Sequence, residues 1–460
     1  MFFKSSTRVV LLLVIVLLYV PFLNQAFHID DRIYLEIADN IHLQPFFPYD
    51  YKPVFEGVGA ADAASHSHLP LTSYYLSFVQ LVSGTDAEWV YHTAFLVFPI
   101  LAAFAFFDLA QRYVRNSLPA AILLVGAPAF STLGHTLMPD VPLLTFWLLS
   151  LSRLLRITSG KGSKLDHIVL PLSVLAAAFI SMVTFGLVLL IVAFLLLDRK
   201  GAKEASTRYW VLVLLSPLIL WVAWYLRAYL HYDRFVLVNT LLHMDKRQAL
   251  DWTLMGAKVM SFVLNVGGVF LFPLLIWVGV SGRWRTRFAL LAFFLAFVPF
   301  YFFGLEWAWV HILLFALMLA SGILLFWEFL ALLGDNSAET RLVVLWFFGI
   351  LTSCLVLYYA GSVRYTLLAL PPAILVLLRC LEHRIQSEYF LRNIVWSGVL
   401  LSLFYSVPIA YADYRFAGLY RTAAEQLCSK YGTSENQVWF TGEWGFRYYF
   451  EKEGAKMLPR

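Results

Sequence analysis

The sequence is poor in charged residues. Only 14% of its 460 residues are Asp, Glu, Lys or Arg, whereas a soluble domain carries about 25%. Hydrophobic residues make up 61%, and the mean hydropathy is +0.74. Apolar runs long enough to cross a bilayer recur from one end of the chain to the other. This shortage of charge argues against a soluble globular protein and predicts an all-α, multi-pass membrane protein.

Cysteine is also scarce, and the common nucleotide-binding motifs are missing. The three cysteines form no C-x-x-C pair, so the sequence indicates neither a disulfide framework nor a zinc cage. No Gly-rich phosphate loop occurs, which argues against an ATP-driven pump, and the lack of an N-x-S/T acceptor fits a bacterial source. The net charge of +5 is spread over many short loops and does not indicate nucleic-acid binding.

The apolar runs divide into about thirteen candidate membrane spans. Their ranges are 9–27, 89–111, 118–133, 141–157, 167–182, 184–198, 209–230, 259–280, 288–304, 309–333, 342–360, 366–380 and 393–411. The stretch 167–198 is too long for one span and is interrupted at SMVTFG, so we divide it into two short helices. Residues 1–27 resemble a signal peptide, but no small-x-small cleavage site follows, so we interpret them as a retained first span.

The positive-inside rule predicts where the two ends of the chain lie. Lys4 and Arg8 precede the first span and place the N-terminus in the cytoplasm. Most loops that then face the cytoplasm are rich in Lys and Arg, and GDNSAETR is the weak member. This agreement supports an odd number of spans and an extracytoplasmic C-terminus. We therefore expect a transmembrane domain over 1–411, with an external first loop at 28–88, and an external domain over 412–460.

The two external stretches have different expected structures. In the first loop an isoleucine recurs at every fourth position from Ile29 to Ile41, which predicts an amphipathic helix over 30–42 lying on the membrane. The tail is rich in aromatic and β-branched residues and predicts a small α/β domain, with strands packed on a short helix near 418–430. The abrupt end of the chain is compatible with a truncated domain. No internal repeat is visible, which counts against a transporter built from inverted halves.

Two adjacent carboxylates, Asp30 and Asp31, follow the first span at the outer membrane surface. In the simpler interpretation Asp30 caps the interfacial helix and Asp31 lies favourably in its first turn. In the alternative, one carboxylate is a general base that accepts a proton from an attacking hydroxyl or amine. Composition alone favours the cap, and both roles hold together if each Asp takes one of them. Tyr34 lies one turn further along.

Two histidines alternate in the segment SHSHLPL. In an extended segment His66 and His68 share a face. In one interpretation their two imidazoles supply half of the ligands of a metal site. Two polar loop histidines are the commoner interpretation of an isolated H-x-H. We therefore predict no required cofactor and leave open a divalent metal near Asp30, His66 and His68.

Charged residues also stand at the outer ends of later spans. Asp140 lies between two prolines at the start of the fourth span, where an N-cap is the simple alternative. Arg364 and Tyr365 precede an apolar span and form either a snorkelling anchor or a clamp on a lipid phosphate, because Arg makes bidentate charge-assisted bonds. Lys246 and Arg247 lie in another external loop and would add charge to the same anion.

The order of these motifs resembles that of the membrane glycosyltransferases with the GT-C fold. The closest similarity is to the bacterial branch of the dolichyl-phosphate-mannose protein mannosyltransferase family, which includes the lipid A aminoarabinose transferase. The motifs that carry the resemblance are DDRIY after the first span, HLPL late in the first loop, MPDVPLLTFWLLSL at the fourth span and VRYTLLALPP at a late span. Each motif is short, and their order and sidedness over nearly the whole chain supply the specificity.

The resemblance implies a GT-C fold and an inverting sugar transfer in the inner membrane of a bacterium. The donor would be a polyprenyl-phosphate-linked sugar, and the acceptor a glycan, lipid or protein outside the cytoplasm. By position in the motifs, Asp30 matches the catalytic acid, and Asp31 and Asp140 match supporting acids. Arg364 and Tyr365 match the region that meets the donor phosphate.

Two departures from the family pattern distinguish this chain from an aminoarabinose transferase. His68 stands where those enzymes have a phosphate-contacting lysine, and a histidine is charged at neutral pH only if its pKa is raised. The segment VTFGL lacks a lysine that relatives often carry. Two other classes remain as alternatives: a transporter or flippase of lipid-linked sugars, and a glycan polymerase. The polymerase is the weaker alternative, because its main external loop usually falls late in the chain.

Overall fold

The computed structural model describes residues 2–51, 68–233, 251–280, 282–303, 308–356, 362–432 and 437–458. Its helices begin with α1 (Phe2–Tyr19), α2 (Asp31–Leu43), α3 (Leu71–Ser83), α4 (Glu88–Phe95), α5 (Val97–Ala110), α6 (Ser117–Val125), α7 (Pro128–Gly134), α8 (Asp140–Thr158), α9 (Lys164–Ile180), α10 (Thr184–Leu197) and α11 (Thr207–Tyr232). They continue with α13 (Met255–Val269), α14 (Leu271–Val280), α15 (Gly282–Phe303), α16 (Trp309–Ala331), α17 (Ala338–Val356), the 3-10 helix η7 (Val363–Ala369), α18 (Leu370–Arg384), α19 (Glu388–Tyr431) and α20 (Trp444–Lys452). Strands β1 (Trp439–Phe440) and β2 (Lys456–Met457) pair in parallel.

The all-α membrane architecture predicted from the sequence is confirmed, and every predicted span contains helix. Among the described residues, eight helices are long and apolar enough to cross a membrane, or nine if the bent pair α6–α7 counts as one span. The predicted number of thirteen is not confirmed by this measure. The shorter apolar helices include α10, one half of the stretch that we divided in two; the division is correct, because the chain is extended at Ser181 between α9 and α10.

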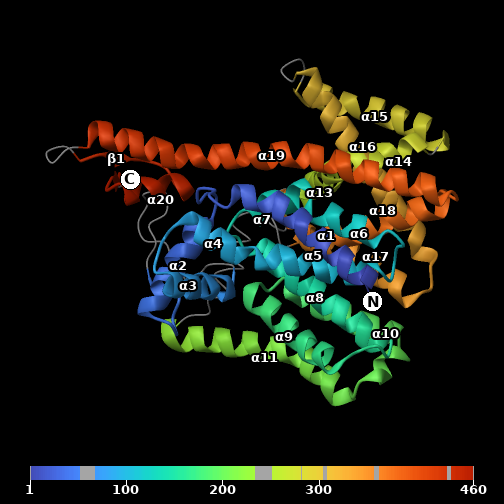
Figure 1. Cartoon of the computed structure of the whole chain (residues 1–460), viewed down its shortest axis with the longest axis horizontal. Coiled ribbons are helices and arrows are strands. Elements are labelled where there is room, and N and C mark those ends of the chain that lie inside the picture. The colour runs from blue at the N-terminus through green and yellow to red at the C-terminus, as the bar shows by residue number, and fades with distance from the viewer. Residues whose placement is uncertain are drawn as a thin grey trace.

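The long axis of the molecule separates two ends with different contents (Figure 1). Helices α2, α3, α4 and α20 gather at one end with the C-terminus, and the N-terminus lies toward the other. The 44-residue α19 runs along the whole length. At 1.5 Å per residue it measures about 66 Å, roughly twice the thickness of a bilayer core. Its C-terminal half therefore extends beyond the membrane.

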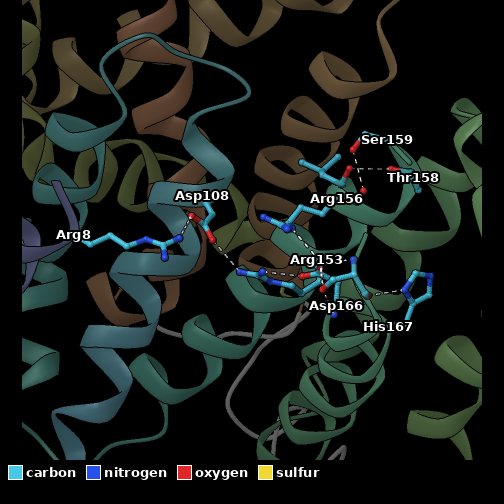
Figure 2. Close-up of polar contacts among 10 residues, drawn as sticks. Arg8, Asp108, Arg153, Arg156, Thr158, Ser159, Asp166 and His167 are labelled. Atoms are coloured by element: carbon cyan, nitrogen blue, oxygen red, sulfur yellow. Dashed lines mark hydrogen bonds and ion pairs between the residues drawn. The ribbon is translucent and has the colours of Figure 1, made fainter. Parts of the chain in front are cut away.

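A cluster of ion pairs joins four helices at the end away from α2 (Figure 2). Asp108 at the end of α5 bonds Arg8 of α1 and Arg153 of α8, each at 3.1 Å. Asp166 at the start of α9 bonds Arg153 at 2.9 Å and Arg156 at 3.2 Å. The charge pattern assigns these helix ends to the same side of the membrane, the cytoplasmic one. The ion pairs show that they do lie together.

The tail differs from the prediction in two respects. No separate helix forms near 418–430, because α19 continues through the expected boundary at 411/412 to Tyr431. The middle of the aromatic segment predicted as strands, which holds most of its aromatic residues, is instead the helix α20, flanked by the two-residue strands β1 and β2. Its aromatic residues recur at helical spacing: the rings of Phe446 and Phe450 stack with centroids 4.2 Å apart.

The predicted amphipathic helix is present as α2, but its isoleucine stripe is covered by protein. Ile37 and Ile41 are buried against a set of aromatic side chains from neighbouring segments. The opposite side of the helix meets α20, where Arg32 forms ion pairs of 3.5 Å with Glu443 and Glu451. Helix α2 is therefore held between other elements rather than resting on the lipid surface as predicted.

Candidate functional site

Three residues from distant parts of the chain meet beside the start of α2. The Arg364 guanidinium donates a hydrogen bond from Nη1 to Asp30 Oδ2 at 2.9 Å, across 334 positions of sequence. Its Nε lies 3.8 Å from Asp140 Oδ1. The three side chains are only 14–25% exposed. One arginine thus bridges two of the three carboxylates that the sequence singled out.

The two spans that carry Asp140 and Arg364 are rigidly placed. Asp140 is the first residue of α8, and Arg364 lies in η7, which leads directly into α18. In each of these two spans, 78% of the most apolar 18-residue stretch is buried inside the protein. This share is higher than in the other long helices of the described part. A site built on enclosed helices keeps its geometry better than one on loops.

The backbone just before Asp30 is strained. Ile29 has φ = 50°, in the left-handed region that a β-branched side chain strongly disfavours. Such a conformation costs about 1–3 kcal/mol and persists only where surrounding contacts impose it. Asp30 occupies the N-cap position of α2 but makes no side-chain capping bond there. Its carboxylate faces Arg364 instead, so the simple cap interpretation of Asp30 does not hold.

Asp31 takes the structural role that its neighbour leaves. Its side chain is fully buried, and both oxygens accept backbone N–H groups, from Leu137 at 2.8 Å and from His28 at 3.1 Å. The first bond ties the start of α2 to the segment just before Asp140. This bond links the position of Asp30 to that of Asp140. The supporting role that the resemblance implies for Asp31 in the reaction stays a prediction.

His28 extends this anchor to α19, a connection that the sequence did not predict. Its Nε2 lies 3.0 Å from Asp413 Oδ2, its Nδ1 lies 3.8 Å from Asp31, and the side chain is 2% exposed. Gln25 donates to the same Asp413 oxygen at 3.2 Å. Burial opposes a charge on the imidazole, but the carboxylates of Asp31 and Asp413 outweigh it and raise the pKa of His28 to about 9. No local sequence signal relates residues 28 and 413.

The raised pKa of His28 predicts a pH-dependent stability. The folded value of about 9 exceeds the ordinary 6.5, so protonation favours the folded state by roughly 3 kcal/mol. This contribution is complete below pH 6.5 and disappears as the pH rises through 9. We expect the unfolding temperature of the detergent-solubilised protein to fall between pH 7 and 10, and this fall to be smaller in His28→Gln. Asp31, Asp413, His92 and His135 are the titratable groups that interact with His28 in the described part of the chain. Equal slopes in both proteins would contradict the assignment.

The site retains unused hydrogen-bonding capacity. Asp140 Oδ2 and Arg364 Nε are buried atoms that have no hydrogen-bond partner among the described residues. A buried polar group without a partner costs free energy, and such groups at clefts commonly mark where a ligand binds. An acceptor and a donor therefore remain available beside the Asp30–Arg364 bond. A phosphate oxygen fits the free guanidinium N–H, and a hydroxyl group fits the free carboxylate oxygen.

Aromatic side chains and His68 border the charged group. Tyr34 is 3% exposed, and its ring centroid lies 6.2 Å from that of His68. Burial is the main cause that raises the pKa of Tyr34 well above its usual range, so its hydroxyl stays protonated. The Arg364 guanidinium lies 5.5 Å from the centre of the Tyr365 ring. The site is therefore a cation held between two acids, with aromatic groups beside it.

The HLPL segment is held in place by a break between helices. The Leu69 N–H donates to the carbonyl of Ile180 at 2.9 Å, at the end of α9 where the chain interrupts its helix. Tyr49 donates its hydroxyl to the carbonyl of His68. The helix break predicted from SMVTFG thus positions His68 beside Tyr34. Three other candidate residues, His66, Lys246 and Arg247, lie outside the described residues.

The described site does not fit a divalent metal. No group of three or more His, Cys, Asp or Glu side chains is arranged to hold an ion within the described ranges. Asp30 and Asp140, the acids that would bind one, are instead bridged by the Arg364 guanidinium. A cation already occupies this electrostatic position, so we derive no step through a metal.

Comparison with known proteins identifies the architecture. Residues 66–225 match the family model described as dolichyl-phosphate-mannose-protein mannosyltransferase. The structure of ArnT from Cupriavidus metallidurans bound to undecaprenyl phosphate aligns with a TM-score of 0.51, covering 99% of this chain and 85% of that one at 16% identity. The chain has the GT-C fold. The resemblance predicted from the order of the motifs is thereby confirmed.

A second GT-C structure aligns over a similar share of the chain. The oligosaccharyltransferase of Archaeoglobus fulgidus in the apo form has a TM-score of 0.55 and 14% identity, and the match covers 98% of this chain and 64% of that one. The same archaeal protein was solved in complex with zinc and sulfate. No curated protein matches the sequence. At these identities the GT-C comparison establishes the fold, and the chemistry has to be argued from the site.

Proposed function

We propose that the protein is an inverting glycosyltransferase that moves a sugar from a polyprenyl-phosphate carrier to an acceptor outside the cytoplasm. The observation that carries the proposal is the bridge of Arg364 between Asp30 and Asp140, at one end of a GT-C fold. The site joins a basic oxygen to a guanidinium with a free N–H. Sugar transfer from a lipid phosphate needs both, because a proton leaves the nucleophile and negative charge develops on the phosphate.

In the proposed reaction Asp30 is the general base. It takes the proton of the acceptor hydroxyl or amine as that atom bonds to the anomeric carbon of the sugar. The bond from this carbon to the phosphate oxygen breaks on the opposite side, and the electron pair leaves with the polyprenyl phosphate. A single displacement of this kind inverts the anomeric configuration. No nucleotide takes part, in agreement with the missing phosphate loop.

Arg364 is the proposed donor-phosphate residue. Its guanidinium carries five N–H donors, and Asp30 uses the donor at Nη1. Its Nε–H has no hydrogen-bond partner in the described ranges and is available to the leaving phosphate, whose growing charge it would stabilise. Asp140 holds the guanidinium in place at 3.8 Å. Tyr365 is proposed to add a polar contact to the same phosphate, together with His68, Lys246 and Arg247.

The lipid-linked donor is supported by the nature of the relatives. The ArnT structure holds undecaprenyl phosphate, and one structure of the archaeal oligosaccharyltransferase is tethered with an acceptor peptide. We extend the first class of ligand to this chain and assign the acceptor to the same broad group of glycans, lipids and proteins. We place the enzyme in a bacterial inner membrane, with its N-terminus in the cytoplasm and α2, α20 and the C-terminus outside.

The deciding experiment follows the fate of the carrier lipid. The purified protein is incubated in liposomes with a panel of polyprenyl-phosphate sugars and with envelope lipids as acceptors. We expect polyprenyl phosphate to appear in equal amount to a glycosylated acceptor, with the anomeric configuration inverted. A flippase would move the donor across the bilayer without cleaving it, and a polymerase would lengthen a glycan on its carrier. Either result would overturn the proposal.

A further inference from the structure

An arginine near the end of α11, Arg227, lies apart from the site and has no polar partner within the described part of the chain. Arg227 belongs to α11, which runs along the edge of the molecule (Figure 1). Only 22% of the most apolar 18-residue stretch of this helix is buried inside the protein. The neighbours of Arg227, Leu226 and Leu230, are 54% and 74% exposed and would face lipid. Among the described residues no carboxylate pairs with Arg227 and none accepts its hydrogen bonds. The nearby Asp50 pairs with His231 instead, at 3.3 Å.

Aromatic rings hold the Arg227 side chain in a defined position. The guanidinium carbon lies 4.4 Å from the centre of the Phe47 ring and 5.5 Å from that of Trp224. Phe47 is itself stacked on His231, with centroids 3.7 Å apart. A ring face attracts a cation but supplies no hydrogen-bond acceptor. The rings therefore hold the arginine by stacking. Its N–H groups have no acceptor among the residues that the structure describes and so remain available to an anion.

The surroundings select a phosphate on a lipid. The same group lines a small apolar cavity that also includes Tyr49, Ala228 and Tyr232. This cavity lies at the C-terminal end of α11, where residues 46–49 of the first external loop pack against the helix. Lipid headgroup phosphates lie at the ends of membrane spans, so an arginine held there by aromatic rings is placed to meet them. Arginine binds phosphate through paired N–H donors.

We infer that Arg227, Phe47 and Trp224 form a binding site for the phosphate of an anionic lipid headgroup, separate from the one proposed at Arg364. The site adjoins the candidate active site through one intermediate residue: Tyr49 lines its cavity and donates a hydrogen bond to the carbonyl of His68. A lipid phosphate bound there lies on the flank by which a membrane-borne molecule reaches His68 and Tyr34. This site is independent of the proposed reaction, and its test measures binding alone.

The test uses the full chain in detergent and native mass spectrometry, with phosphatidylglycerol as the probe and phosphatidylcholine as the neutral comparison. We expect phosphatidylglycerol to bind more tightly than phosphatidylcholine and Arg227→Gln to lose about tenfold or more of that affinity, because a charge-assisted bond is lost. Arg227→Lys should lose less. Phe47→Leu keeps the charge but removes the stacking and should weaken binding by a smaller factor.

Arg392→Gln is the matched control. Arg392 likewise lies over an aromatic ring, that of Tyr389 at 5.9 Å, near the start of α19. Its replacement should leave lipid binding unchanged. Millimolar inorganic phosphate should compete with the lipid if the headgroup phosphate is what binds. Equal binding of both lipids, or equal losses in Arg227→Gln and Arg392→Gln, would overturn the inference and leave Arg227 as an interfacial anchor. Unfolding temperatures measured without lipid show whether each variant is folded. If Arg227→Gln does not fold, the loss of lipid binding in Phe47→Leu tests the inference in its place.

Discussion

Asp30→Asn is expected to lower the turnover of sugar transfer by about 10²–10⁴-fold while the protein stays folded. This is the usual contribution of a positioned general base. Asparagine preserves the shape of the side chain and still accepts a hydrogen bond from Arg364, which donates to Asp30 at 2.9 Å. It has no basic oxygen to take the acceptor proton. The measurement is the rate of polyprenyl phosphate release at saturating donor.

The adjacent carboxylate provides the control for this experiment. Asp31→Asn disturbs a fully buried group that accepts two backbone N–H bonds, and an amide nitrogen cannot accept the second. We expect Asp31→Asn to lower the unfolding temperature clearly and Asp30→Asn to leave it nearly unchanged. Wild-type turnover in Asp30→Asn would remove the general base from the mechanism. A large loss of stability in Asp30→Asn would show that it acts as a structural residue instead.

Arg364→Ala is expected to have the second largest effect, with a loss of about 10²–10³-fold, the size found when a preorganised group that stabilises developing charge is removed. The loss has two physical sources. The leaving phosphate loses the positive charge that would stabilise it. Asp30 and Asp140 also lose the guanidinium that lies between their carboxylates. Arg364→Lys keeps a positive charge but has no planar fork of donors. It should therefore retain more activity than Arg364→Ala.

Donor kinetics separate these two contributions. If Arg364 binds the donor phosphate, the KM for the lipid-linked sugar should rise more in Arg364→Ala than in Arg364→Lys, and inhibition by free polyprenyl phosphate should weaken in the same order. Arg379, which pairs with Asp335 at 3.3 Å in another part of the protein, supplies the control variant Arg379→Lys. Wild-type donor kinetics in both Arg364 variants would refute the phosphate role.

The two neighbouring acids show how the fold divides one motif between two tasks. Adjacent residues at the start of a helix point in different directions, so Asp31 turns into the protein and Asp30 toward Arg364. The strained φ of Ile29 supports this arrangement, since only firm contacts on both sides keep a β-branched residue there. Those contacts are the bonds of Asp31 to Leu137 and to His28, which is in turn held by Asp413.

The sequence by itself determined the features that depend on local pattern. Long apolar runs are read directly as membrane helices, because a backbone in lipid has to satisfy its own hydrogen bonds. The break after Ile180 and the helix after Asp30 were correctly predicted from short segments. The order of the motifs was sufficient to indicate the GT-C fold. The tail was predicted less well, because β-propensity depends on what the aromatic residues pack against.

Only the tertiary structure decided which charged residues meet. Whether Asp30 caps its helix or faces a cation depends on Arg364, which is 334 positions away and is brought there by the packing of η7 against α8. The link from His28 to Asp413 likewise requires a helix of 44 residues that extends far beyond the bilayer. The period of apolar residues along a helix indicates which face of that helix is buried. The partner of a buried charge depends instead on contacts between elements that are distant in the sequence. The sequence therefore singled out Asp30, Asp140 and Arg364 as candidates, and the packing of the helices brought their side chains together.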